Sequence, residues 1–277
     1  MTLFATGLAL HAEERNAQGA PPVLFLHGWL DHCHSFDPLW AELPGAWRLF
    51  ALDFRGHGQS AHLTQGIYHF TDYLADVHAG VLHLGGRVHL VGHSMGGAVA
   101  LLYAAAAPER VKSVTAIESL GPLGGRPEDI VKRMGQFVVE LEKVGRKRLY
   151  PTLEDAVARV RANNPGLSPS AALLLTRHGT RAVPGGVEFT FDPVLRHRSA
   201  FTFDDAQLGA LLGAVKQPVQ VIQGTRGYPF DADQAADRLR RLGAPAPIAV
   251  EGGHHVHLDS PAQVATYLRQ FVERVEG

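Results

Sequence analysis

Short apolar segments recur along this chain, separated by alanine- and leucine-rich stretches of helical length. Short buried strands that alternate with helices favour a parallel, doubly wound sheet. Ligands of such sheets bind at the carboxyl ends of the strands. We therefore predict an α/β fold with a mostly parallel sheet, and the residues that end its strands are the candidates for chemistry. The expected strands are 22–27, 48–53, 88–92, 111–118, 218–223 and 247–251.

The alternation breaks between about residues 121 and 200. Three helices are expected there: one over 128–144, one capped by Thr152 and Asp155, and one that begins at Ser168 and stops at Gly179. We predict one core built from residues 1–120 and 201–277, with 121–200 as a helical cap over the strand ends. The first of these helices has an apolar face made of Ile130, Met134, Phe137, Val138 and Leu141.

The composition limits the partners and the compartment. The 277 residues carry a formal net charge of -1 and one cysteine, Cys33. A balanced charge favours a small-molecule substrate and argues against nucleic acid or a membrane as partner. A single cysteine and the lack of a signal-like or membrane-spanning run predict a cytoplasmic protein. We expect a monomer or a homodimer.

The segment GHSMGG, residues 92–97, lies between an expected strand and an expected helix. Its glycines permit a tight, strained turn that would expose the Ser94 hydroxyl above the sheet. The Met95 amide and the helix N-terminus would then face an oxyanion formed beside Ser94. The alternative is that Ser94 only caps the helix.

Two other expected strand ends carry residues that suit the same chemistry. The segment GGHHVHLDSP, 252–261, follows one strand and places histidines where one of them can reach a nucleophile. The segment HGW, 27–29, ends another strand, and a turn there would offer the Trp29 amide as a second oxyanion donor.

Together with DFRGHGQS, 53–60, these motifs resemble those of the α/β-hydrolase family, and the serine-hydrolase-like branch is the most similar. The resemblance implies an α/β-hydrolase fold with Ser94 as nucleophile, His254 as general base, and the amides of Trp29 and Met95 as oxyanion hole. His255 and His257 would be accessory.

The acid of the expected triad departs from the family pattern. Members usually carry Asp or Glu soon after the strand 218–223, but here the text is GTRGYPFDAD, 224–233. Glu118 ends the preceding strand, and some relatives take their acid from that position. Glu118 is therefore the favoured acid. Asp231 is the alternative, although it also suits a helix cap, and the absence of any acid stays open.

We predict a serine hydrolase that cleaves a small, hydrophobic carboxylic ester or related acyl bond through an acyl-enzyme, without metal or cofactor. A C–C bond hydrolase, lactonase or perhydrolase on the same triad is one alternative, and a catalytically silent ligand receptor is another. The expected substrate-binding residues are His27, Gly28, Leu30, His93, Leu120, Met134 and Phe137.

Three further features have more ordinary interpretations. Residues 31–34, DHCH, are typical metal-ligand types, but adjacent positions cannot all face one ion. Asp53 is expected to fix its loop. The basic residues Lys143, Arg146, Lys147 and Arg148 indicate either an anion site or a solvated helix end, and the solvated end is favoured.

Overall fold

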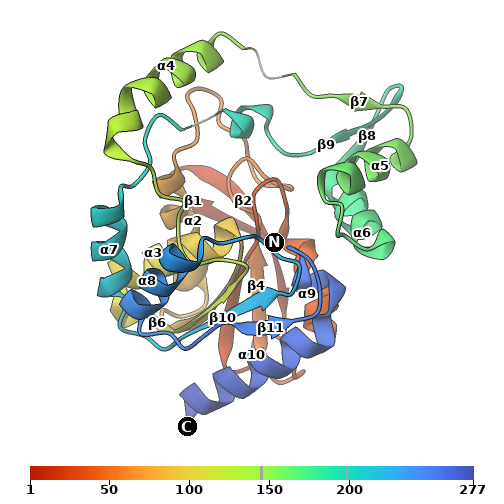
Figure 1. Cartoon of the computed structure of the whole chain (residues 1–277). Helices are drawn as coiled ribbons and strands as arrows, with labels where there is room; N and C mark the ends of the chain where they lie inside the picture. The colour runs from red at the N-terminus through yellow and green to blue at the C-terminus, as the bar shows by residue number, and fades with distance from the viewer. Residues whose placement is uncertain (144–145, 198) are drawn as a thin grey trace.

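The computed structural model describes residues 1–143, 146–197 and 199–277. Its centre is an eight-stranded sheet with the order β1-β2-β4-β3-β5-β6-β10-β11 (Figure 1). The strands from β4 to β11 pair in parallel, and β1 and β2 are antiparallel additions at one edge. The strands are β1 Thr2–Ala5, β2 Leu8–Arg15, β3 Pro22–Leu26, β4 Arg48–Leu52, β5 Val88–His93, β6 Val111–Ile117, β10 Val219–Gly224 and β11 Ile248–Val250.

All six predicted strands are present, and the predicted α/β fold with a mostly parallel sheet is confirmed. β1 and β2 were not predicted. β2 contains the charged run Glu13–Arg15, and none of the three side chains is buried. β2 lies between β1 and β4, and its polar side chains give a weak apolar signal, so its pairing with these two strands identifies it.

Helices cover both faces of the sheet, and each face has its own hydrophobic core. One core includes Val77 of α2, Leu101 of α3 and Leu212 of α7. The other includes Leu39 of α1 and Leu268 of α10. Figure 1 shows α3, α7 and α8 on one side of the sheet and α9 and α10 on the other. These helices are α1 Asp37–Ala41, α2 Tyr73–His83, α3 Met95–Ala106, α7 Asp205–Ala214, α8 Ala232–Leu242, α9 Val256–Asp259 and α10 Pro261–Glu276.

The insertion between β6 and α7 contains the three expected helices: α4 Ile130–Leu141, α5 Leu153–Asn163 and α6 Pro169–Gly179. The capping box of Thr152 with Asp155 and the Ser168 N-cap are both confirmed. The expected first helix also included Val144, which lies outside the described residues.

The prediction of a helical insertion was incomplete, because the insertion also contains strands. A three-stranded antiparallel sheet, in the order β7-β9-β8, joins the helices. Its strands β7 Leu149–Tyr150, β8 Thr180–Val183 and β9 Gly186–Phe189 are short, and β8 and β9 are joined by a glycine turn, so no long apolar alternation announces them. Figure 1 shows α4 on one side of this insertion and the small sheet with α5 and α6 on the other.

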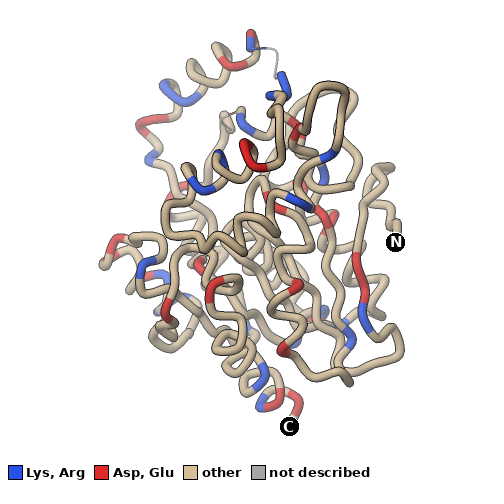
Figure 2. Tube along the Cα trace, turned by 90° about the vertical axis from the view of Figure 1, so that its right-hand side faces the viewer, with Lys and Arg blue, Asp and Glu red and all other residues tan. Residues whose placement is uncertain are grey.

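Charged residues of both signs are spread along the chain (Figure 2), with a local run of basic residues following α4. Among the described residues, no helix is both long and apolar enough to cross a membrane.

Candidate active site

Ser94 sits on a strained turn between β5 and α3. Its φ of 51° and ψ of -113° lie outside the regions that L-residues favour. Two neighbouring glycines make the turn sterically feasible. A Cβ on Gly96 would lie 2.0 Å from the Leu26 carbonyl oxygen, and one on Gly92 would lie 2.4 Å from the backbone of Gly96. The turn therefore needs glycine at both positions and holds Ser94, half-buried, at the carboxyl end of the sheet.

The expected oxyanion donors lie beside this turn. Met95 is the first residue of α3, so its amide is one of the four at the helix start that have no acceptor within the helix. Trp29 follows β3, which pairs with β5, and its side chain is 54% exposed. The Trp29 indole Nε1 donates to the carbonyl oxygen of Leu195 at 3.1 Å, which links this loop to the insertion.

A pocket of about 190 Å³ lies against Trp29 and Met95. Most of its lining is aromatic or aliphatic, and it is supplied by two segments that the sequence analysis had not singled out, together with Phe137 of α4. An aromatic-rich stretch at 67–73 was the only sequence signal for the first of these segments. The additional lining residues are Ile67, Tyr68, Phe70, Tyr73, Val194, Leu195, His197 and Ser199.

Glu118 and His254 form a direct hydrogen bond. The His254 Nδ1–H group donates to Glu118 Oε2 at 3.0 Å. Two backbone amides also donate to this carboxylate, Gly224 N to Oε1 and Tyr228 N to Oε2, each at 2.6 Å. The Glu118 side chain is fully buried, whereas that of His254 is 34% exposed. The three donors hold the carboxylate in place, and the bond to Glu118 fixes the ring orientation of His254.

The structure also explains why no carboxylate follows β10. A Cβ on Gly227 would lie 2.0 Å from Glu118 Oε1, so the Glu118 carboxylate occupies the space that a side chain there would need. Asp231, the alternative acid, instead caps α8 by accepting a hydrogen bond from Gln234 N at 2.9 Å. The structure therefore brings Glu118, and not Asp231, to His254.

Histidines surround the loop that carries His254. The His93 Nε2–H group donates to the His254 carbonyl oxygen at 2.8 Å, which ties the loop to the residue before Ser94. The His93 ring lies 4.3 Å from that of His257 and 5.0 Å from that of His255, centroid to centroid. Burial holds the pKa of His93 and His257 well below the ordinary value, so both stay neutral. His93 forms the hydrogen bond to the loop, whereas neither ring nitrogen of His257 has a hydrogen-bond partner among the described residues, so His257 serves as a packing group.

The predicted substrate-binding residues divide into two groups. Of the seven, only Phe137 lines the pocket beside Trp29 and Met95. His27 and Leu120 are buried in the core, and His27 is bonded through both ring nitrogens to Phe54 N and the Gly28 carbonyl. A position at a strand end does not determine whether the side chain points into the pocket or inward.

The remaining predicted contacts are structural in other ways. His93 is buried, Gly28 leaves room for the His93 ring, which a Cβ would approach to 2.9 Å, and Leu30 has a φ of 61° in the left-handed region. Met134 is 38% exposed on α4 and lies outside the pocket lining. We therefore assign His93, Gly28 and Leu30 to shaping the loops around the pocket.

The four residues 31–34 point to different places, as expected for adjacent positions. Asp31 lies near His93 and His255, Cys33 near His11 and Asp53, and His34 near Asp37 and His178. The His32 Nε2–H group donates to the Leu175 carbonyl at 2.9 Å. In each of the three groups the nearest ligand atoms lie within 4.8 Å of one another. Of the three groups, the one around Asp31 suits a divalent metal best, because Asp31 Oδ2 and His93 Nδ1 are buried and have no hydrogen-bond partner among the described residues.

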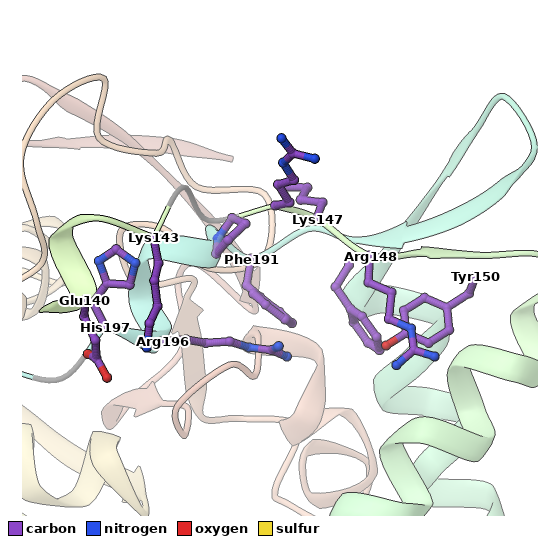
Figure 3. Close-up of a pocket in the computed structure, with 11 residues that line it drawn as sticks. Glu140, Lys143, Lys147, Arg148, Tyr150, Phe191, Arg196 and His197 are labelled. Carbon is purple, nitrogen blue, oxygen red and sulfur yellow. The ribbon is translucent and has the colours of Figure 1, made fainter.

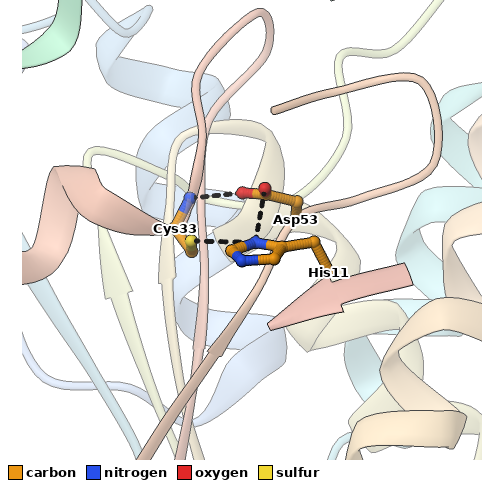
Figure 4. Close-up of side chains that lie close together, drawn as sticks. All are labelled: His11, Cys33 and Asp53. Carbon is orange, nitrogen blue, oxygen red and sulfur yellow. Dashed lines mark hydrogen bonds and ion pairs between the residues drawn. The ribbon is translucent and has the colours of Figure 1, made fainter. Parts of the chain in front are cut away.

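The group around Cys33 is better explained as a loop clamp (Figure 4). Asp53 accepts hydrogen bonds from His11 Nδ1 at 3.0 Å, Cys33 N at 2.7 Å and Gln59 N at 2.8 Å. Burial and the adjacent Asp53 raise the pKa of the Cys33 thiol, which therefore stays protonated and is a poor metal ligand. This arrangement agrees with the prediction that Asp53 fixes its loop.

Buried neutral histidines predict a loss of stability in mild acid. Burial lowers the pKa of His57 to about 3, and it also lowers the pKa of His27, His93 and His257. Below about pH 6.5 the unfolded chain binds protons at these sites that the folded chain does not. Each site then lowers the free energy of unfolding by about 1.4 kcal/mol for every pH unit of acidification. The hydrogen bond to Asp37 raises the pKa of His34, so protonation of His34 stabilises the folded chain and offsets the loss at one of these sites.

We expect the free energy of unfolding, measured by urea titration, to fall by several kcal/mol between pH 7 and pH 5. Buried carboxylates contribute little in this window, because their unfolded pKa values are near 4. The variant His57→Asn should show a shallower pH dependence by up to one proton. Equal stability at the two pH values would contradict the neutral state of these histidines.

A strand–turn–helix turn carrying a strained serine, on a mostly parallel sheet with a histidine loop at the same edge, is the architecture of one large class of proteins. The family model described as alpha/beta hydrolase fold matches residues 21–184, and this chain belongs to that family. The chain is 34% identical over 265 residues to the serine hydrolase-like protein of Danio rerio, with 91% of this chain and 81% of the relative covered.

Two further proteins show the same likeness. Serine hydrolase-like protein 2 of Homo sapiens is 28% identical over 276 residues, covering 91% of this chain and 87% of the relative. The crystal structure of a hypothetical protein from Pseudomonas aeruginosa PAO1 superposes with a TM-score of 0.83 at 32% identity, covering 96% of this chain and 97% of that chain. The predicted resemblance to the serine-hydrolase-like branch is therefore confirmed.

Proposed function

We propose that the protein is a serine hydrolase that cleaves a hydrophobic carboxylic ester or related acyl bond through an acyl-enzyme. The observation that carries this proposal is the hydrogen bond of 3.0 Å between the buried Glu118 carboxylate and His254 Nδ1. The loop that carries His254 is in turn hydrogen-bonded to His93, the residue before Ser94. A fixed anion behind an accessible imidazole is the arrangement that makes a neighbouring serine nucleophilic.

In this proposal Ser94 Oγ attacks the substrate carbonyl carbon while its proton passes to His254 Nε2. The amides of Met95 and Trp29 stabilise the resulting oxyanion. The bond to the leaving group then breaks, and His254 returns the proton to that group. Water attacks the acyl-enzyme in the second half, with His254 again taking and returning the proton, so that the acid is released and Ser94 is regenerated.

The pocket beside Trp29 and Met95 supports a hydrophobic acyl or alcohol group as the part bound there, because its lining is mostly aromatic and aliphatic. Leu195 and Phe137 bring the insertion into this lining. We therefore propose that residues 121–200 act as a cap that forms part of the substrate pocket.

Labelling by a fluorophosphonate probe tests the proposal. We expect one covalent adduct per chain, located on Ser94 by peptide mass spectrometry, and turnover of p-nitrophenyl esters whose rate depends on acyl chain length. The probe reacts with activated serines, so a catalytically silent receptor would stay unlabelled. Absence of both labelling and turnover would refute the proposal. Labelling with turnover only of lactones, of C–C bonds or of peracids would assign one of the alternative reactions of the same triad.

A further inference from the structure

A second pocket, of about 250 Å³, lies within the insertion. It is bounded by the end of α4, the segment leading into β7, and the segment from β9 to the 3₁₀ turn Pro193–Arg196. Figure 3 shows Lys143 and Arg196 on one side of this space and Arg148 with Tyr150 on the other. We call it the basic pocket.

Positive charge dominates the basic pocket. Its lining contains one carboxylate, Glu140, against five cationic side chains: Lys143, Arg146, Lys147, Arg148 and Arg196. Lys147 Nζ lies 3.8 Å from Glu188 Oε1 and forms an ion pair with it. In the part of the chain that the structure describes, the other four cations form no ion pair. Cations that outnumber the carboxylates beside them repel one another, and a bound anion reduces that cost.

The same pocket has an aromatic wall. The Phe189 and Phe191 rings are stacked at 5.4 Å, and Tyr150 meets Phe189 edge to face at 5.5 Å, centroid to centroid. The guanidinium of Arg148 lies 5.1 Å from the Tyr150 ring centre, and that of Arg196 lies 4.9 Å from the Phe191 ring centre. Arginines over aromatic rings are suited both to phosphate and to the flat face of a nucleobase.

The basic pocket adjoins the pocket beside the Ser94 turn. His197 lines both of them, and the preceding residues Arg196 and Leu195 line one each. Leu195 also accepts the hydrogen bond from the Trp29 indole. A ligand that fills both pockets therefore has an apolar group near Ser94 and an anionic group with a flat ring in the insertion.

We propose that the substrate is an acyl thioester of the coenzyme A type, whose phosphates and adenine base occupy the basic pocket. This inference rests on the proposed function and specifies its leaving group. The chemistry balances without a further reagent: the C–S bond of the thioester breaks as the acyl group transfers to Ser94 Oγ, the thiolate takes the proton from His254, and water releases the acid.

Kinetics with matched thioesters test the proposal. Hexanoyl-coenzyme A, hexanoyl-phosphopantetheine and hexanoyl-N-acetylcysteamine share the acyl group and the thioester but differ in phosphates and base. We expect kcat/KM to fall in that order, by at least about tenfold from the first to the last, mainly through KM. Raising the salt concentration should narrow the difference.

The variant Arg148→Gln/Arg196→Gln should lose most of the preference for the coenzyme A thioester while keeping its rate on hexanoyl-N-acetylcysteamine. The matched control is Lys132→Gln/Arg159→Gln, which removes two exposed cations of the same insertion that do not line the basic pocket. The preference should be unchanged in this control.

Several outcomes would overturn the inference and leave the proposed function intact. These are equal kcat/KM for all three thioesters, a preference that survives in the pocket variant, or a preference lost equally in the control. Equal rates with the phosphopantetheine and coenzyme A thioesters would overturn the nucleotide assignment. If no thioester or ester is cleaved, the proposed function fails. In that case, calorimetric titration of coenzyme A into the Ser94→Ala variant tests separately whether the basic pocket binds the nucleotide. Absence of binding would overturn the inference.

Discussion

Replacement of Ser94 by alanine should abolish hydrolysis and probe labelling while leaving the fold unchanged. In serine hydrolases the loss of the nucleophile lowers kcat by about 10⁶-fold, because no other group can form the acyl-enzyme. The strained backbone at a φ of 51° is imposed by Gly92, Gly96 and the sheet, so alanine should adopt it as serine does. Stopped assays on the best ester and fluorophosphonate labelling measure the loss, and circular dichroism and thermal melting report the fold.

Ser170→Ala is the matched control, because Ser170 is an exposed serine in the first turn of α6. It should keep full activity and labelling. If Ser94→Ala retained more than a few per cent of the wild-type rate, the nucleophile would have to be sought elsewhere. A large drop in melting temperature would mean that the Ser94 hydroxyl supports the turn. The test would then rest on Ser94→Cys, in which a thiol replaces the hydroxyl and a thiol-alkylating reagent should block any remaining activity.

The sequence was most informative where an element is buried on both faces. β3 is an apolar run, and β5 and β6 are almost wholly buried although each includes polar residues, so the existence of these strands, their parallel pairing and the chemistry at their ends could be predicted together. β2 and the small sheet of the insertion are half-exposed and largely polar, and the pairings of β2 with β4 and of β7 with β9 join segments that are distant in the chain. Their placement depends on tertiary pairing that local pattern does not carry.

The same contrast applies to the candidate site. Backbone geometry could be predicted, because a strained turn needs glycines at fixed positions, as at Gly92 and Gly96. Side-chain direction could not. His27 and Leu120 both follow strands, yet both point into the core. Most of the pocket lining comes from 67–73, from 194–197 and from Ser199, and no spacing in the sequence brings these segments together.

Glu118 shows how a missing motif can be read physically. The sequence lacked an acid directly after β10, and Glu118, which follows β6, was favoured over Asp231 as its replacement. β6 and β10 are neighbouring parallel strands, with Ile117 paired to Ile222, so their ends meet at one edge. The Glu118 carboxylate crosses to the β10 side and accepts the Gly224 and Tyr228 amides there. Gly227 leaves the space that this crossing needs.

Glu118→Gln should therefore lower kcat by about 10⁴-fold, as loss of the triad acid does in the serine proteases. Glutamine is neutral, so it no longer stabilises the imidazolium that forms on His254. Its amide group can also reorient the ring into the wrong tautomer. KM should change little, because Glu118 is fully buried and does not touch the substrate pocket. Fluorophosphonate labelling should slow in parallel with kcat.

Loss of a buried carboxylate also removes hydrogen bonds, so the rate loss must be separated from a loss of folding. Glutamine retains one acceptor oxygen for the Gly224 and Tyr228 amides, and we expect the free energy of unfolding to fall by about 1–3 kcal/mol. A purely structural role would lower stability without changing kcat per folded molecule. Asp231→Asn is the control, because asparagine caps a helix as well as aspartate does and α8 should be unaffected. If Asp231→Asn loses the activity and Glu118→Gln keeps it, Asp231 is the acid and the hydrogen bond between His254 and Glu118 has a structural role.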